Sequence, residues 1–284
     1  MRLPGRETTL ASLVANQAVD VLIVGGGING AGMLRELALN GIDALLVDRA
    51  DFAAGATSAS SRMIHGGLRY LENGEFRLVR ESLRERDRLL QLAPHAVKPL
   101  VTTIPVFSRW SGLGNAFKRF FGFATPPSAR GALLIKVGLS FYDIFTARRR
   151  VLPTHHFTSR AEALRLRPKL HPDIVCTATY HDAQVALPER LCLDLIADAC
   201  AVHPGTRAIN YCALTRREGD AVVLHDTVSG REFFVRPRVI VNATGGWIDL
   251  ANAALGQPTH WIGGTKGSHL IVDHPELLAA CGGE

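Results

Sequence analysis

The chain has 284 residues, 47% of them hydrophobic, and a formal net charge of +6. A chain of this length can bury roughly three quarters of its unfolded surface, so it is expected to be globular, with one large or two ordinary domains. Its five cysteines form no C-x-x-C pair, which argues against a zinc site or a disulfide framework and favours a reducing compartment. The first twenty residues lack the features of a signal or transit peptide, and no apolar run is long enough to span a bilayer.

A dinucleotide-binding turn is predicted between residues 20 and 48. The expected order is a strand at 21–24, the glycines Gly25, Gly27 and Gly30, a helix at 31–40, a strand at 43–47 and then Asp48. The first glycine permits a tight turn, the second lets a pyrophosphate approach the backbone, and the third lets helix and strand pack closely. The helix N-terminus attracts phosphates, and a carboxylate after the second strand can accept from ribose hydroxyls. This unit alone does not distinguish NAD from FAD.

The segment that follows favours FAD, because it supplies hydroxyls and glycines where a nicotinamide dehydrogenase would continue with another helix and strand. The hydroxyls that could bind a pyrophosphate or ribityl chain belong to Thr57, Ser58, Ser60 and Ser61. The turn His65-Gly66-Gly67 would bring backbone close to a flat ring. The alternative is a serine-capped helix followed by an ordinary turn.

Residues 76–92 have the spacing of an amphipathic helix, with Arg77 and Glu81 one turn apart and a solvated charged face. Residues 101–150 then hold eight basic residues and one acidic residue, so essentially the whole charge excess of the chain lies in this block. Aromatic residues alternate with these charges, which suits an element lying among lipid headgroups. Nucleic acid would attract the same charge, but no motif for it is present, and a core helix with a basic rim is the remaining alternative.

The second half is expected to return to the dinucleotide sheet around an antiparallel insertion. A helix at 188–202 would bury Cys192 and Cys200 as small core residues. Strands are predicted at 207–213, 221–226, 232–235, 239–241 and 270–272. The segment Asn242-Ala243-Thr244-Gly245 ends the fourth of these strands.

The segments GGGINGAG, TSASSRMIHGGLRYLE, EFRLVRESLRER, NATG and KGSH together closely resemble the FAD-dependent, quinone-linked glycerol-3-phosphate dehydrogenases. The resemblance extends from residue 20 to about residue 272. It implies an α/β flavoprotein in which an FAD/NAD(P)-binding Rossmann-like βαβ domain is joined to an antiparallel β substrate domain, as in glutathione reductase and the amino-acid oxidases. It also places Ala243, Thr244 and Gly245 close to FAD, and the alternative for this segment is a plain strand-to-helix turn.

The resemblance implies oxidation of sn-glycerol 3-phosphate to dihydroxyacetone phosphate, which requires a base and cations for the phosphate. His65 and His269 are the two candidate bases, and the sequence does not choose between them. Arg69 and Tyr70 are candidate phosphate or hydroxyl anchors, and Lys266 is a weaker candidate for orienting substrate or flavin.

These candidates have structural alternatives. Arg69 could instead pair with Glu72 or Glu75, and Tyr70 could be a core aromatic. The histidines outside any motif, such as His155, His156 and His225, are expected at the surface.

Two departures from the family pattern are visible. Asp48 stands where the family usually has glutamate, so its ribose contact is one methylene shorter. The chain ends at Glu284, before further substrate-domain strands and a flavin-contacting segment of the family, so it is expected to be C-terminally truncated. The expected organisation is an N-terminal extension (1–19), a first FAD-binding part (20–100), a membrane-facing substrate-domain segment (101–175), a second FAD-binding part with a β insertion (176–250) and the start of further substrate-domain strands (251–284).

Three functions follow as hypotheses. The first is a glycerol-3-phosphate dehydrogenase that passes electrons to quinone on the cytoplasmic face of the inner membrane, which it contacts through residues 101–150. The second is a non-catalytic FAD-binding fragment. The third is a related flavin-dependent amine or hydroxy-acid oxidase or, more remotely, an NAD enzyme. A homodimer is left open, and neither a metal nor a nucleic-acid partner is expected.

Overall fold

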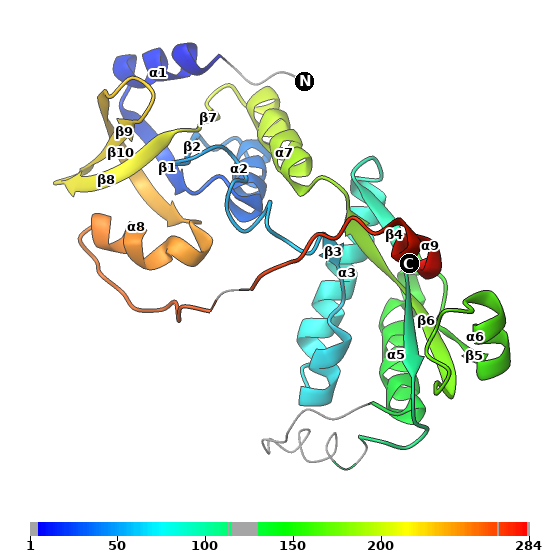
Figure 1. Cartoon of the computed structure of the whole chain (residues 1–284). Coiled ribbons are helices and arrows are strands. Elements are labelled where there is room, and N and C mark those ends of the chain that lie inside the picture. Colours follow the sequence, from blue (N-terminus) through cyan, green and yellow to red (C-terminus); the bar gives the residue numbers. More distant parts are fainter. Residues whose placement is uncertain (1–4, 113, 115–129, 266, 283–284) are drawn as a thin grey trace. The chain divides into compact units, whose positions relative to one another are not determined.

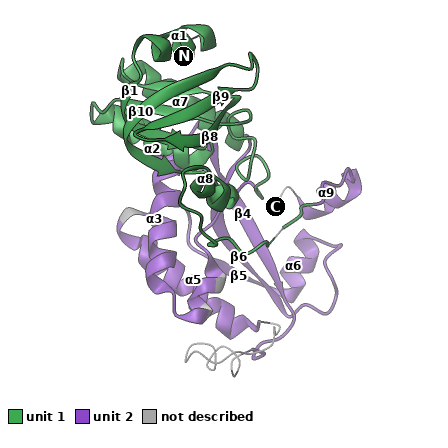
Figure 2. Cartoon of the chain, turned by 90° about the vertical axis from the view of Figure 1, so that its left-hand side faces the viewer, with its two compact units in different colours: residues 1–61, 187–269 green, residues 62–186, 270–284 purple. Residues whose placement is uncertain are grey.

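The computed structural model describes residues 5–112, 114, 130–265 and 267–282. The chain forms two compact units, coloured separately in Figure 2. The first comprises residues 1–61 and 187–269, and the second comprises residues 62–186 and 270–284. These boundaries differ from those of the five functional segments expected from the sequence, whose roles stay predictions.

The first unit is built on a six-stranded sheet with the order β7-β2-β1-β10-β9-β8 (Figure 1). Its strands are β1 (Ala18–Val24), β2 (Ala44–Val47), β7 (Arg207–Ile209), β8 (Cys212–Glu218), β9 (Ala221–Asp226) and β10 (Glu232–Asn242). Its helices are α1 (Arg6–Ala15), α2 (Ile28–Leu39), α7 (Pro188–Val202), α8 (Ile248–Ala254) and the short 3₁₀ helix η3 (Gly245–Trp247). The predicted βαβ unit is confirmed in β1, α2 and β2.

Strand β10 joins the parallel and antiparallel parts of this sheet. Its first residues pair antiparallel with β9, and its second part, from Arg236 to Asn242, pairs parallel with β1. The two strands expected at 232–235 and 239–241 are therefore one continuous strand. The single strand expected at 207–213 is instead divided, because Tyr211 adopts a φ of 51° and separates β7 from β8.

Side chains alternate across the central strands, so the sheet has an apolar layer on each face. On one face, α1 packs Leu10 and Leu13 against a layer that includes Leu22 and Leu45. On the other face, α2 and α7 lie side by side (Figure 1) and bury Leu34 and Ile196 among others. Such a two-sided core explains why the predicted strands are short and almost wholly apolar.

The second unit is an antiparallel sheet covered by helices. Its strands are β3 (Met63–Ile64), β4 (Val97–Val106), β5 (His156–Ser159) and β6 (Cys176–Val185), with β6 paired to all three others. Its helices are η1 (Leu68–Asn73), α3 (Phe76–Leu92), α5 (Ala132–Thr146), η2 (Ala147–Arg149), α6 (Arg160–Leu166) and α9 (Pro275–Cys281). Val79 and Leu83 of α3 and Leu139 and Tyr142 of α5 form the buried layer over β6.

The helix predicted at 76–92 is confirmed as α3, and Arg77 pairs with Glu81 at 2.9 Å. The charges expected on its solvated face are exposed, but Arg86 and Asp87 of the same helix are buried. In α5 the buried residues are Ile135, Leu139 and Tyr142, whereas Val137 and Ile144 are exposed.

The structure also tests the predictions for residues 270–272 and for the cysteines. The strand predicted at 270–272 is wrong: these residues run as an irregular segment in which Leu270 is 92% and Ile271 99% exposed, and a β-strand requires a hydrogen-bonded neighbour. Cys192 is confirmed as a small buried core residue, whereas Cys200 is half-buried. All five cysteines are free thiols. Within the described ranges, no helix is long and apolar enough to cross a membrane.

Candidate functional site

The glycine turn after β1 is shaped by two close backbone approaches. Gly25 has a φ of 111°, and a Cβ atom there would lie 2.6 Å from the carbonyl oxygen of Ala243. A Cβ atom on Gly30 would lie 1.9 Å from the carbonyl oxygen of Gly25. The first and third glycines thus have the structural roles that the sequence indicated. A Cβ atom on Gly27 would meet only the Thr57 hydroxyl, at 3.2 Å, so the second glycine lies in a less crowded place.

Asp48 follows β2 at the same edge of the sheet. Its Oδ2 accepts a hydrogen bond from the Gly26 N–H at 2.7 Å, and its Oδ1 accepts one from the Ala50 N–H at 2.9 Å. Each oxygen still has a second lone pair, because a carboxylate offers about four acceptor sites. Asp48 therefore braces the glycine turn and keeps acceptor capacity for a ribose hydroxyl.

The hydroxyls of the serine-rich segment divide into two groups. Thr57 Oγ1 accepts from the Ile28 N–H at 3.1 Å and thereby caps the first turn of α2, where a phosphate was expected to bind. Ser58 donates to the Gly55 carbonyl oxygen at 3.0 Å, inside its own turn. Ser60 and Ser61 are exposed. Thr57 is thus a predicted hydroxyl that bonds directly to the helix N-terminus.

The segment after β10 is held by Asn242, which the sequence pattern marked only as part of a turn. Its Oδ1 accepts from the Thr244 hydroxyl at 2.6 Å, and its Nδ2 donates to the Ile248 carbonyl oxygen at 2.9 Å. These bonds fix the backbone of Ala243 against Gly25. Asparagine at a strand end has the side chain for such a local turn, which was the available signal.

These residues fit the phosphate and ribose part of a dinucleotide. The first N–H groups of α2 have no acceptor inside their helix, the Gly25–Gly27 backbone lies beside them, and Asp48 closes the other side. All of the residues that form this phosphate and ribose site belong to the first unit.

The second unit contains the His65-Gly66-Gly67 turn. A Cβ atom on Gly66 would lie 2.4 Å from Leu83 Cδ2, and Gly67 has a φ of 72°. Both positions therefore require glycine for packing and backbone reasons within the unit, apart from any flavin ring. The Tyr70 ring packs on Gly67 and is 46% exposed, so the alternative that Tyr70 is a core aromatic is wrong.

A buried ion cluster that no sequence pattern predicted lies under this turn. Arg86 Nη1 lies 3.0 Å from Asp182 Oδ1, and Arg86 Nη2 lies 2.8 Å from Asp87 Oδ1. Arg86 is 3% and Asp182 1% exposed. Burial raises the pKa of Asp182 above its ordinary value although Arg86 opposes the shift, and burial also raises the pKa of Tyr180 to about 12. The residues were missed because Arg86 falls within a charged helix and its partner lies almost a hundred positions away.

The remaining predicted catalytic residues belong to different units or lie outside the described residues. His65 is exposed in the second unit, and His269 is exposed in the first. The side chain of Arg69 and the whole of Lys266 lie outside the described residues. The choice of base and the roles of Arg69 and Lys266 therefore stay predictions.

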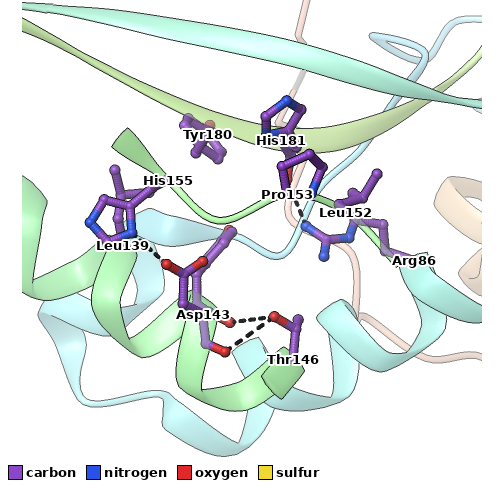
Figure 3. Close-up of a pocket in the computed structure, with 10 residues that line it drawn as sticks. Arg86, Leu139, Asp143, Thr146, Leu152, Pro153, His155, Tyr180 and His181 are labelled. Atoms are coloured by element: carbon purple, nitrogen blue, oxygen red, sulfur yellow. Dashed lines mark hydrogen bonds and ion pairs between the residues drawn. The ribbon is translucent and has the colours of Figure 1, made fainter. Parts of the chain in front are cut away.

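An open polar pocket of about 280 Å³, part of it solvent, lies between α5 and the start of β5 in the second unit (Figure 3). His155 Nδ1 lies 2.7 Å from Asp143 Oδ2 at its edge, and Arg86 donates to the His181 carbonyl oxygen behind it. The expectation that His155 is a surface residue is wrong, because it has this partner and only 14% of its side chain is exposed. His156 is exposed as expected, and His225 is half-buried.

Comparison with known proteins identifies the family. The family model described as FAD dependent oxidoreductase (DAO) matches residues 20–282, which covers the glycine turn, the His65 turn and both sheets. The chain belongs to this family. As a FAD-dependent oxidoreductase family member it has the predicted α/β fold, which its similarity to solved flavoprotein structures confirms.

Several similar proteins carry names of glycerol phosphate dehydrogenases or oxidases. A glycerol-3-phosphate dehydrogenase of Synechocystis sp. is 40% identical over 278 residues, covering 92% of this chain and 46% of that protein. An alpha-glycerophosphate oxidase of Streptococcus pyogenes serotype M6 is 29% identical over 266 residues, covering 91% and 41%. The structure of glycerol-3-phosphate dehydrogenase from Bacillus halodurans complexed with FAD aligns with a TM-score of 0.60 at 21% identity, over 88% of this chain and 38% of that one. This family member thus spans less than half the length of the curated relatives it matches.

Proposed function

We propose that the chain binds FAD and takes part in the oxidation of sn-glycerol 3-phosphate to dihydroxyacetone phosphate, with quinone as electron acceptor. The observation that carries the proposal is the meeting of Gly25 and Ala243, which joins the two FAD-binding segments expected from the sequence at one edge of the sheet. The choice of substrate is supported by the 40% identity with a relative named glycerol-3-phosphate dehydrogenase.

The roles of the residues follow from their chemistry. The amides of the first turn of α2 would hold the pyrophosphate, and Asp48 would accept from the ribose. FAD, when bound, supplies the acceptor for the hydride of the substrate. His65 or His269 would remove the hydroxyl proton, and the Arg69 guanidinium would hold the phosphate by a two-pronged contact.

A spectroscopic titration tests this function. The purified chain is expected to be yellow, with flavin absorbance near about 450 nm, and to bleach when glycerol 3-phosphate is added without oxygen. Glycerol is the matched control, because it has the same hydroxyls without the phosphate and should leave the flavin oxidised. A yellow chain that does not bleach would favour the FAD-binding fragment, and a colourless chain that binds no added FAD would contradict flavin binding.

The role of Arg69 is tested by Arg69→Ala, with Arg77→Ala as control. Loss of a charged contact to phosphate should raise KM for glycerol 3-phosphate by about tenfold or more while the FAD content stays the same. Arg77 is exposed and pairs within α3, so its removal should change neither quantity. An equal loss of flavin in Arg69→Ala would refute the substrate role.

A second candidate concerns the acceptor and the substrate class. One relative is named alpha-glycerophosphate oxidase, so molecular oxygen is the alternative acceptor. Hydrogen peroxide formed in air, with no reduction of a soluble quinone, would favour oxidase activity. Bleaching by an amino acid instead of glycerol 3-phosphate would favour a flavin-dependent amine oxidase.

A further inference from the structure

The pairing of β3 with β6 stops at a particular place. Met63 pairs with Gln184 and Ile64 with Ala183, and one more step of this register would set His65 opposite Asp182. In antiparallel strands, residues directly opposite each other have side chains on the same face, with Cβ atoms about 5 Å apart. The candidate base thus directly follows β3, at the position that an extended register would set opposite the buried carboxylate.

An ion pair replaces the next pair of ladder hydrogen bonds. The Val185 N–H donates to the Arg62 carbonyl oxygen, and hydrogen-bonded pairs alternate with non-bonded pairs along an antiparallel ladder. The next hydrogen-bonded position is the pair Ile64–Ala183, and the one after it would join Gly66 to His181. Instead, the Gly66 N–H donates to Asp182 Oδ1 at 3.4 Å, and the His181 carbonyl oxygen accepts from Arg86 Nη1 at 2.9 Å. Arg86 and Asp182 therefore end the ladder and let the chain turn at Gly66.

One oxygen of this carboxylate is left over. Asp182 Oδ1 accepts from both Gly66 and Arg86, whereas Oδ2 is buried and has no hydrogen-bond partner among the described residues. A buried acceptor without a donor is costly, and a buried ion pair adds little stability beyond what apolar side chains would supply. The pair is therefore better explained by the geometry it fixes. The hydroxyls of Tyr180 and Tyr142 also interact with this carboxyl, and an imidazole N–H at position 65 is the further donor that the register offers.

We propose that Asp182 is the positioning residue for His65. Its Oδ1 fixes the backbone at Gly66, and its Oδ2 accepts a hydrogen bond from the His65 imidazole. That bond holds the proton on one ring nitrogen and leaves the lone pair of the other nitrogen directed away from Asp182, toward a substrate hydroxyl. The link to catalysis rests on the proposed function, whereas the contact itself does not.

The contact can be measured on the whole chain without FAD or substrate, so its failure is distinguishable from failure of the proposed function. Nitrogen-15 spectra of the histidine rings report which nitrogen carries the proton, and His65→Gln identifies the signals of His65. At a mildly basic pH, one tautomer of His65 should dominate by about tenfold, as expected for one hydrogen bond to a charged acceptor. His156, which is exposed in the same chain, gives the reference ratio for a free ring.

The decisive variant is Asp182→Asn, which keeps the side-chain size but removes the second acceptor. Its His65 ratio should fall to within about twofold of that of His156. Asp87→Asn is the matched control, because it neutralises the other carboxylate that contacts the Arg86 guanidinium, at Nη2 instead of Nη1, and it should leave the ratio unchanged.

Two results would overturn the proposal: an unchanged ratio in Asp182→Asn, or equal changes in the two variants. If Asp182→Asn does not fold, the unmodified chain decides by itself, because a His65 ratio equal to that of His156 overturns the proposal and a tenfold preference supports it.

Discussion

Gly25 is the residue whose backbone geometry is most directly linked to binding of the proposed cofactor. A Cβ atom at this position would lie 2.6 Å from a backbone oxygen, and its φ of 111° is unfavourable for any side chain. Gly25→Ala should therefore lower the flavin content by about tenfold or more and reduce the melting temperature, because such strain costs about 1–3 kcal/mol. Flavin absorbance per protein and thermal unfolding measure both effects.

Gly32→Ala is the control for this change. Gly32 lies in α2, and nothing lies within 4 Å of where its Cβ atom would be. Alanine is favoured over glycine in a helix by about 1 kcal/mol, so the variant should be more stable and bind FAD normally. Normal flavin content in Gly25→Ala would contradict the close approach of Gly25 to Ala243.

Individual residues differ in how far the sequence could predict them. The glycines of the first turn were predictable because their spacing reflects backbone constraints that act locally. The cap from Thr57 to Ile28 and the Arg86–Asp182 pair were not, because each depends on where the fold places a distant partner. No local pattern reports such a partner.

At the scale of elements, α1 is attached to the first sheet by a charge pair. Arg6 bonds Asp226, which is fully buried at the end of β9 and also accepts from Ser229 and Val228. The Arg6 guanidinium holds the pKa of Asp226 well below its usual range. The stabilisation is therefore present above the unfolded pKa of about 4 and is lost as the pH falls through the lower pKa of the folded state.

Arg6→Met tests this attachment. Removing one partner of a buried pair should lower the free energy of unfolding by about 3 kcal/mol at neutral pH, and the difference should shrink steadily below about pH 4. Urea unfolding at several pH values measures it. Arg77→Met, which breaks an exposed pair, should cost less than about 0.5 kcal/mol. A loss at pH 3 as large as that at neutral pH would contradict the assignment.

Elements also show the limits of pattern reading. Helices α3 and α7 match their predicted bounds because a helix completes its hydrogen bonds within itself. The strands at 207–213 and 270–272 were mispredicted because strands take their partners from elsewhere. β7 pairs with β2 while β8 pairs with β9, and the segment at 270–272 is exposed.

For the whole molecule, the contact of residues 101–150 with a membrane stays a prediction that exposed side chains allow to be tested. In the described part of this segment, Trp110 is 68% and Ile144 64% exposed. Arg109 precedes Trp110, and Arg148 lies four residues after Ile144. Apolar side chains surrounded by cations are typical of a surface that lies among anionic headgroups. The chain should therefore sediment with anionic vesicles, more so at low salt, and less with neutral ones.

Ile144→Ser should weaken this binding by about tenfold, the loss expected when one large apolar side chain no longer enters the lipid. Val228→Ser is the control, because Val228 is 67% exposed but lies in the first unit. Equal loss in the two variants, or binding independent of lipid charge, would count against a membrane-facing role of the segment.

The sequence by itself determined the βαβ unit, the main helices and the family resemblance. These depend on local periodicity, on glycine spacing and on contiguous motifs, all of which can be read along the chain. Only the tertiary structure decided that β10 serves two pairings, that Gly25 meets Ala243 and that a buried Arg86–Asp182 pair ends the β3–β6 ladder. Each of these joins groups far apart in the chain, so its energy depends on a distance that the sequence does not state.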